Sequence, residues 1–297
     1  MTHPETSELV RADGTVLRYC LYGPPDGYPV VSHNGSPSSR WKWPTLVESM
    51  RRSKLRLLVY DRPGYGGSTR RPGRTVADAV DDVRALADAQ RWDQFAVFGG
   101  SGGGPHALAC AALLADRVIS CAVLSGVKPA DPGTPVPEEA ELRSQLAEVA
   151  AEIMGRIDDG GPELPTGPGP AARDDPDAMA RLRATFVDGT HGWVDDSFAL
   201  ARPWGFDLAT ITVPVGLWRG TNDANVPPEH ADYLLAHIPT AQGHVYTGGH
   251  LPGAAVYDEI YDWLHTSRGS SQRAQVSSSM DESRAITLNN SLSRPEA

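Results

Sequence analysis

A glycine-rich turn carries the clearest chemical signal in the sequence. The segment FGGSGGGP, residues 98–105, contains a G-x-S-x-G pattern centred on Ser101. An apolar run typical of a strand precedes it, and a run typical of a helix follows it. On so sharp a strand-to-helix turn, neighbours without side chains let the chain close and leave the serine hydroxyl exposed. We therefore predict that Ser101 is a nucleophile.

Two other interpretations fit a glycine-rich turn, namely a plain connection and a loop that binds phosphate. The phosphate loop is disfavoured, because no G-x-G-x-x-G pattern can be aligned to this segment and no lysine follows the glycines as it does in a P-loop. The plain connection stays open on this motif alone. A serine nucleophile needs a base, so the choice between a nucleophile and a plain connection depends on whether the rest of the chain offers a suitable base.

His250 is the leading candidate for that base, because it follows the last strand pattern in the glycine-rich segment YTGGHLPG. Its rival, His244, falls inside the strand pattern, where a structural role is typical. Asp223 follows the preceding strand in the segment WRGTNDANVPPEH, and it would orient the imidazole and stabilise its charged form. Asp131 is a weaker alternative acid, and Asp223 with its asparagine neighbours could also be a simple turn.

These residues need a scaffold that brings distant segments together. Over residues 7–126, short apolar runs alternate with helical patterns, which predicts a mostly parallel sheet built from βαβ units. A hairpin near Asp13 is expected to join the first two strands, and a helix is expected to start at Thr75, whose hydroxyl would cap the amide near Asp78. Strand and helix patterns return over residues 213–265. The predicted fold class is α/β, with helices on both faces of a central sheet and the candidate residues at its carboxyl edge.

The sequence between these two parts has a different character. A proline-rich lead-in is followed by two helical patterns, the first over residues 138–157 with one apolar face. We expect residues 128–205 to form a helical cap on a discontinuous core made of residues 1–127 and 206–267. The Ser-rich residues 268–297 contain too few large apolar side chains to pack, so we expect a disordered tail.

Composition disfavours several function classes. The net charge of −10 argues against binding to nucleic acid or to an anionic membrane surface. No apolar stretch reaches about 18 residues and the first residues carry no leader pattern, so we expect a cytoplasmic protein. The three cysteines lack metal-ligand spacing and no other metal motif occurs, so we expect structural thiols and no metal site. Basic charge is almost all arginine, with lysine only at Lys42, Lys54 and Lys128.

Taken together, the motifs resemble the α/β-hydrolase superfamily, in its serine-nucleophile branch with a helical cap, over residues 7–265. The order serine, aspartate, histidine is the order of that family's triad. The segment HNGSPSSR, starting at His33, is similar to the family's HG-x-P oxyanion loop. The segment DRPGYGGS, starting at Asp61, is similar to the loop after the fourth strand. Parts of residues 189–208 are similar to segments that lead from the cap back to the core in some bacterial members.

The resemblance implies an oxyanion hole formed by the backbone amides of Ser36 and Gly102, which would bind the charge of a tetrahedral intermediate. One position departs from the family pattern. Asn34 stands where the family usually has the histidine of HG, and His33 comes one place earlier. This departure leaves the detailed geometry of the loop open.

These expectations combine into a serine hydrolase that cleaves a carboxylic ester or related acyl bond of a small to medium apolar substrate through an acyl-enzyme, without a cofactor. One alternative is an aminopeptidase resembling the proline iminopeptidases, although these usually carry a bulky residue where this chain has Gly102. A serine C–C hydrolase or lactonase is another, and a ligand-binding protein of this fold without turnover is a third, of a different class. The expected partner is a small-molecule substrate, and the sequence does not indicate an oligomeric state.

Overall fold

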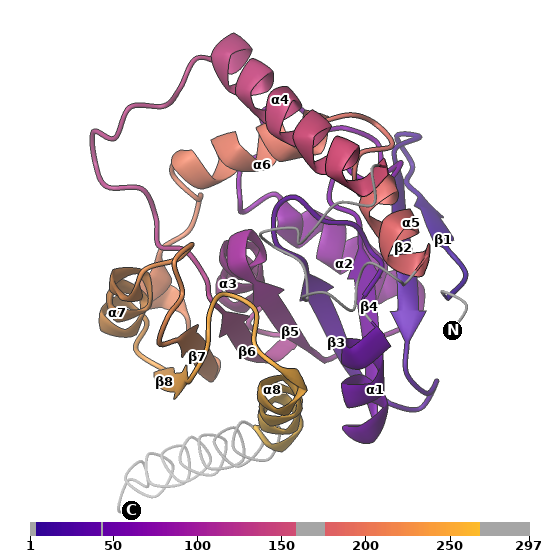
Figure 1. Ribbon diagram of the computed structural model, residues 1–297. Coiled ribbons are helices and arrows are strands. Elements are labelled where there is room, and N and C mark those ends of the chain that lie inside the picture. The colour runs from indigo at the N-terminus through magenta and orange to yellow at the C-terminus, as the bar shows by residue number, and fades with distance from the viewer. Residues whose placement is uncertain (1–3, 43, 159–175, 268–297) are drawn as a thin grey trace, which may run out of the picture.

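One mixed sheet forms the centre of the molecule. The structure, a computed structural model, describes residues 4–42, 44–158 and 176–267. Within these ranges eight strands lie in the order β1-β2-β4-β3-β5-β6-β7-β8 (Figure 1). The β1–β2 and β2–β4 pairs are antiparallel and the other neighbouring pairs are parallel, which confirms the predicted mostly parallel sheet. The strands are β1 (Ser7–Val10), β2 (Val16–Tyr22), β3 (Tyr28–His33), β4 (Leu55–Tyr60), β5 (Phe95–Gly100), β6 (Val118–Leu124), β7 (Val215–Gly220) and β8 (Ala241–Tyr246).

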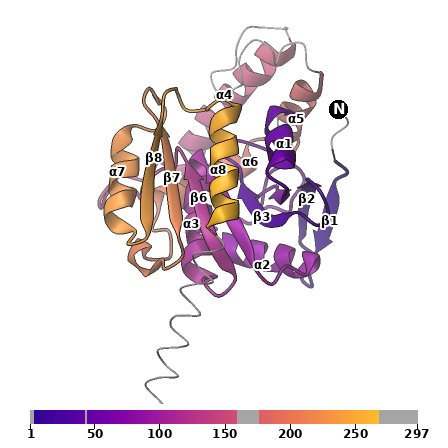
Figure 2. The ribbon, with the colours of Figure 1, turned by 90° about the horizontal axis from the view of Figure 1, so that it is seen from below.

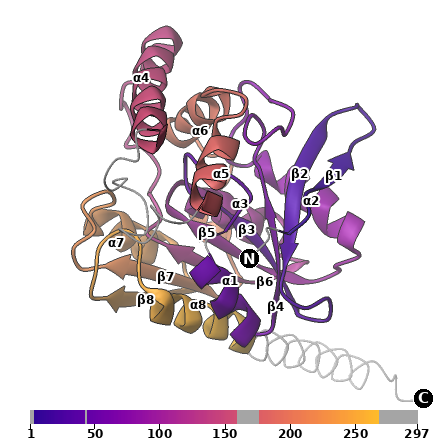
Figure 3. The same cartoon turned by 45° about the vertical axis from the view of Figure 1, so that its right-hand side comes forward.

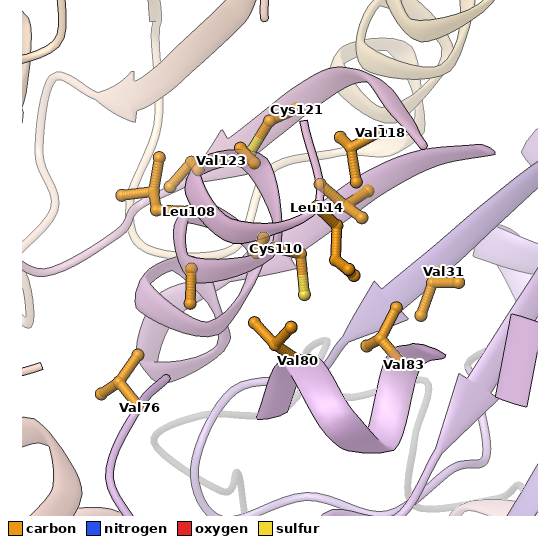
Figure 4. Close-up of a cluster of buried hydrophobic side chains, with 14 of the residues drawn as sticks. Val31, Val76, Val80, Val83, Leu108, Cys110, Leu114, Val118, Cys121 and Val123 are labelled. Atoms are coloured by element: carbon orange, nitrogen blue, oxygen red, sulfur yellow. The ribbon is translucent and has the colours of Figure 1, made fainter. Parts of the chain in front are cut away.

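Helices cover both faces of the sheet, as predicted. They are α1 (Pro44–Arg52), α2 (Ala79–Gln90), α3 (Gly104–Leu113), α4 (Glu139–Asp158), α5 (Pro176–Thr185), α6 (His191–Ala201), α7 (Pro228–His237) and α8 (Ala254–Thr266). On one face α2, α3 and α7 pack on the strands, and Figure 4 shows Val80 of α2 next to Cys110 of α3 and Val83 of α2 pointing toward Val31 of β3. On the other face α1 and α8 lie side by side and contribute Met50 and Leu264 (Figure 2). Because both faces are covered, the central strands are apolar runs without alternation.

Three helices between β6 and β7 form the inserted cap. Figures 1 and 3 show α4, α5 and α6 grouped at the top of the molecule, over the core. The backbone N–H of Gly192 in α6 donates to the Gly64 carbonyl over 3.1 Å, and Asp195 pairs with Arg70 at 2.8 Å. These contacts tie the cap to the loop that follows β4. The tail expected at residues 268–297 lies outside the described residues.

The predicted start of one helix is wrong. The helix expected to begin at Thr75 begins at Ala79, and the Thr75 hydroxyl does not cap it. Instead, the Asp78 carboxylate accepts hydrogen bonds from the Thr75 backbone N–H at 2.6 Å and from the Thr75 hydroxyl at 3.0 Å. A carboxylate is the stronger acceptor, and the Ala77 N–H is engaged by the Trp204 carbonyl at 2.9 Å, so this segment stays a turn.

Membrane-spanning helices and clusters of metal-binding side chains are both absent from the part of the chain that the structure describes. No helix there is both long and apolar enough to cross a bilayer. In those same ranges, no group of three or more His, Cys, Asp or Glu side chains is placed to hold a metal ion. Cys20, Cys110 and Cys121 are buried free thiols.

Candidate active site

Ser101 lies directly after β5, at the turn into α3. Its φ of 50° is in the left-handed region, which few non-glycine residues adopt. The backbone packs closely around it, since a Cβ at Gly103 would overlap the carbonyl oxygens of His33 and Asn34. A Cβ at Gly99 would come within 2.5 Å of the Gly103 carbonyl oxygen. Glycine is therefore required at both positions for this turn to close.

His250 and Asp223 meet at the carboxyl edge of the sheet, in the loops after β8 and β7. The Nδ1 atom of His250 lies 2.9 Å from Oδ2 of Asp223 and 3.1 Å from Oδ1. The same carboxylate accepts the backbone N–H groups of Asn225 and Val226, each at 2.9 Å. An ionised carboxylate only accepts hydrogen bonds, so Nδ1 of His250 carries the proton and Nε2 is left as the basic nitrogen.

The electrostatics of Asp223 favour this state. Burial by itself would raise the pKa of the Asp223 carboxyl. The hydrogen bonds from the Val226 N–H, from His250 and from Ser125 outweigh burial and hold that pKa below its usual value. Asp223 therefore stays ionised at neutral pH.

The two rival residues are engaged elsewhere. Asp131 is exposed and pairs with Lys128. His244 lies within β8, where its ring stacks on Trp218 with 4.2 Å between ring centres, and its Nδ1 lies 3.3 Å from Glu259. Their positions favour structural roles for both.

Ser101 and His250 line one cavity of about 200 Å³. Ser36 of the predicted oxyanion loop lines it too, and so do Arg181 and Thr185 of the cap helix α5. Much of the remaining wall is apolar and includes Trp41, Leu46, Phe98, Leu124, Leu251 and Tyr257. A mostly apolar hollow with a few polar groups is typical of a small-molecule site.

The predicted oxyanion residues lie against each other beside Ser101. A Cβ built on Gly102 would lie 2.9 Å from Oγ and 3.3 Å from Cβ of Ser36. A Cβ built on Gly35 would lie 3.3 Å from Cβ of Ser101, so the oxyanion loop passes very close to the candidate nucleophile. His106 Nδ1 lies 2.9 Å from the Gly102 carbonyl oxygen, and this contact helps to hold the turn in place.

Comparisons with known proteins bear on the family and the fold of this chain. A family profile described as "alpha/beta hydrolase fold" matches residues 28–172. A non-heme chloroperoxidase of Streptomyces lividans is 29% identical over 254 residues, which cover 76% of this chain and 87% of that protein. A bifunctional esterase/perhydrolase of Acinetobacter calcoaceticus is 27% identical over 234 residues, which cover 73% and 82%. This chain has the α/β-hydrolase fold. The crystal structure of a thermophilic esterase from Thermogutta terrifontis has the same fold as this hydrolase, with a TM-score of 0.67, 24% identity, and coverage of 89% of this chain and 99% of that one.

A buried carboxylate of the hydrolase that sequence reasoning missed lies under the oxyanion loop. Asp196 of α6 is fully buried and accepts hydrogen bonds from Arg62, from Arg74 at 2.6 Å and from the Tyr65 hydroxyl at 3.0 Å. The Ser36 hydroxyl also donates to it. Burial would raise the pKa of Asp196, but the two guanidinium groups outweigh it and hold that pKa well below the usual range. The cap is thus bonded to the oxyanion loop through one ionised side chain.

The departure at Asn34 has a partner that sequence reasoning also missed. The Asn34 amide donates to the Ser39 carbonyl oxygen, and its Oδ1 accepts a hydrogen bond from Nζ of Lys42. Lys42 is only 9% exposed and lines the cavity. Burial, with a smaller effect of Arg62, lowers the pKa of Lys42 to about 7. The rarity of lysine in this chain was the one available signal, and it does not show where a lysine points.

Proposed function

We propose that this hydrolase cleaves a carboxylic ester, or a related acyl bond, of a small to medium substrate through an acyl-enzyme on Ser101. The observation that carries the proposal is the 2.9 Å contact between His250 Nδ1 and Asp223 beside a cavity that both Ser101 and His250 line. A base that a carboxylate orients, next to a serine on a strained turn, is the arrangement that activates a hydroxyl.

The proposed reaction has two steps. Ser101 Oγ attacks the carbonyl carbon while His250 Nε2 takes its proton, and Asp223 stabilises the imidazolium. The resulting oxyanion accepts hydrogen bonds from the backbone amides of Ser36 and Gly102. His250 then returns the proton to the leaving oxygen, the alcohol departs, and a water molecule attacks the acyl-enzyme by the same route. The residues suffice for this reaction without a cofactor.

Replacement of the nucleophile tests the proposal. We expect Ser101→Ala to lower kcat on p-nitrophenyl esters by about 10⁴-fold or more and to abolish labelling by a fluorophosphonate. Ser38→Ala is the matched control, because Ser38 lines the same cavity but takes no part in the proposed steps, and this variant should keep the wild-type rate. A Ser101→Ala protein that hydrolyses at the wild-type rate would exclude Ser101. A folded wild-type protein that resists labelling would instead favour ligand binding without turnover.

The aminopeptidase alternative meets an electrostatic obstacle. Such an enzyme must hold the ammonium group of its substrate, which calls for carboxylates. Lys42 and Arg181 line the cavity, and no Asp or Glu does so among the described residues. We therefore expect prolyl amides to be poor substrates. Cleavage of prolyl amides with none of p-nitrophenyl esters would reverse this choice.

A further inference from the structure

The Lys42 amino group lies in the wall of the cavity, where its protonated form has no counter-ion. Nζ of Lys42 donates to Oδ1 of Asn34 and lies 5.7 Å from the ring centre of Phe98. An amide oxygen and a ring face carry only partial negative charge. Among the described residues, no carboxylate pairs with Lys42 and none lines the cavity. A buried ammonium in such surroundings is costly unless something else supplies the negative charge.

The neighbouring groups add to the positive charge. Arg62 and Arg74 share the single carboxylate of Asp196, so that cluster holds more positive than negative charge. Arg40 is paired one to one with Asp61. Lys42 therefore lies next to a surplus of positive charge, in a protein whose net charge is −10. A cationic cavity in an acidic protein attracts and holds an anionic group.

We propose that Lys42 binds a carboxylate carried by the substrate, so that this hydrolase acts on esters with a carboxylate in one of their two halves, such as monoesters of short dicarboxylic acids. This inference rests on the proposed function. The substrate carboxylate would accept a hydrogen bond from Nζ and supply the missing counter-ion, while Trp41 and Phe98 pack on the methylene groups between the carboxylate and the ester. The inference thus modifies the expected apolar substrate: it is apolar except for the end that carries the carboxylate.

Pairs of esters that differ in one carboxylate test the inference on the wild-type protein. In the first pair, p-nitrophenyl pentanoate and mono-p-nitrophenyl glutarate, the acyl half differs. In the second, phenyl butyrate and 4-carboxyphenyl butyrate, the leaving half differs. For one of the pairs we expect kcat/KM to be about 10- to 100-fold higher for the charged ester, mainly through KM, because a hydrogen bond between two charged groups is gained. Equal or lower values for the charged ester of both pairs would overturn the inference.

Substitution of Lys42 assigns the preference to this side chain. We expect Lys42→Met to lose at least about tenfold more kcat/KM on the charged ester than on the neutral one, and Lys42→Arg to keep part of the preference. Lys54→Met is the matched control, because Lys54 is exposed just before β4, and it should leave both esters unchanged. An equal loss on both esters for Lys42→Met would mean that Lys42 only supports the loop, and would contradict the inference.

A binding experiment separates this inference from the proposed function. Ser101→Ala should bind glutarate at least about tenfold more tightly than its uncharged diamide by calorimetry, and the added change Lys42→Met should remove the difference. Lys42-dependent binding of glutarate by a protein that cleaves no ester would uphold the anion site and reject the proposed reaction. Ester cleavage without any preference for glutarate would reject the anion site alone.

Discussion

At the scale of single residues, the conformation of the turn at Ser101 depends on the neighbouring glycines. They differ in whether the surrounding atoms leave room for a side chain. A φ of 50° at Ser101 costs on the order of 1–3 kcal/mol, so the surrounding contacts must hold the turn. Gly103 packs against the backbone of the oxyanion loop, whereas a Cβ at Gly100 would meet no atom within 4 Å. Two glycines of one short segment therefore differ in whether an added methyl group fits.

We expect Gly103→Ala to lower the free energy of unfolding by about 2–4 kcal/mol and to abolish fluorophosphonate labelling, because the carbonyl oxygens of His33 and Asn34 cannot move aside. Gly100→Ala, the control, should stay within about 1 kcal/mol of wild type. Denaturant unfolding of both variants measures the difference. Equal stability of the two would show that the close backbone approach at Gly103 does not limit this turn.

Lys42 is expected to make stability depend on pH. Its pKa is about 7 in the folded protein, against about 10.4 in an unfolded chain. Between these values the unfolded state binds more protons, so this residue's contribution to stability rises with pH across that window. Its burial cost is fully present below pH 7, where Arg62 is the nearby charge that adds to it.

Lys42→Met removes that cost, so the variant should be more stable than wild type by about 1–3 kcal/mol at pH 6, and the gap should close as the pH approaches 10. Chemical unfolding at a series of pH values measures the gap. Lys54→Met should show no such trend. A stability difference between Lys42→Met and wild type that stays constant with pH would contradict the assignment of this pH dependence to Lys42.

At the scale of elements, α6 and the oxyanion loop are joined by the Asp196 carboxylate. It is fully buried and holds two guanidinium groups as well as the Ser36 hydroxyl. The adjacent Asp195 faces a different environment, since its partner Arg70 is 29% exposed. Two neighbouring aspartates of one helix therefore allow a matched comparison.

We expect Asp196→Asn to cost about 3–5 kcal/mol in stability, because it leaves Arg62 and Arg74 buried without their counter-ion. In the protein that remains folded, kcat should fall by about tenfold or more while KM changes little, because the Ser36 amide is displaced from the oxyanion. Asp195→Asn should cost about 1 kcal/mol and spare kcat. Similar kcat values for the two variants would argue against a positioning role for Asp196.

At the scale of the whole molecule, two apolar cores share one sheet and the cap is tethered to them. The cores lie on opposite faces of a sheet that they share, and the cap is held by the buried Asp196 and by the contact between Asp195 and Arg70. Loss of either core exposes the same strands, so neither half is expected to unfold alone.

We therefore expect one cooperative transition on heating, with tryptophan fluorescence and far-ultraviolet circular dichroism giving the same midpoint. Asp196→Asn should uncouple the two signals, because the cap then loses its buried ion pairs. Separate transitions already in the wild-type protein would mean that the cap and the core are independent.

The sequence by itself determined the features that depend on local spacing. A window of about ten residues is enough to predict β5 and β6, the glycine turn at Ser101 and the loops that hold Asp223 and His250. This is because strand periodicity and turn preferences depend on residues within that distance. Parallel strands end at one edge, so a predicted sheet was enough to expect these loops together. The predicted start of α2 was wrong, because the Asp78 carboxylate and the contact with Trp204 hold the residues after Thr75 in a turn, although their local sequence favours a helix.

Only the tertiary structure decided which charges surround the cavity. Asp196 meets Ser36 across 160 positions of chain, and no spacing rule connects them. The sequence alone gives no reason to expect Lys42 anywhere but on the surface, whereas the fold buries it beside Asn34. The energy of a charged group depends on its distance to other charges and on its burial, because a buried charge lies in a medium of low dielectric constant. Neither the distance nor the burial can be deduced from the order of residues along the chain.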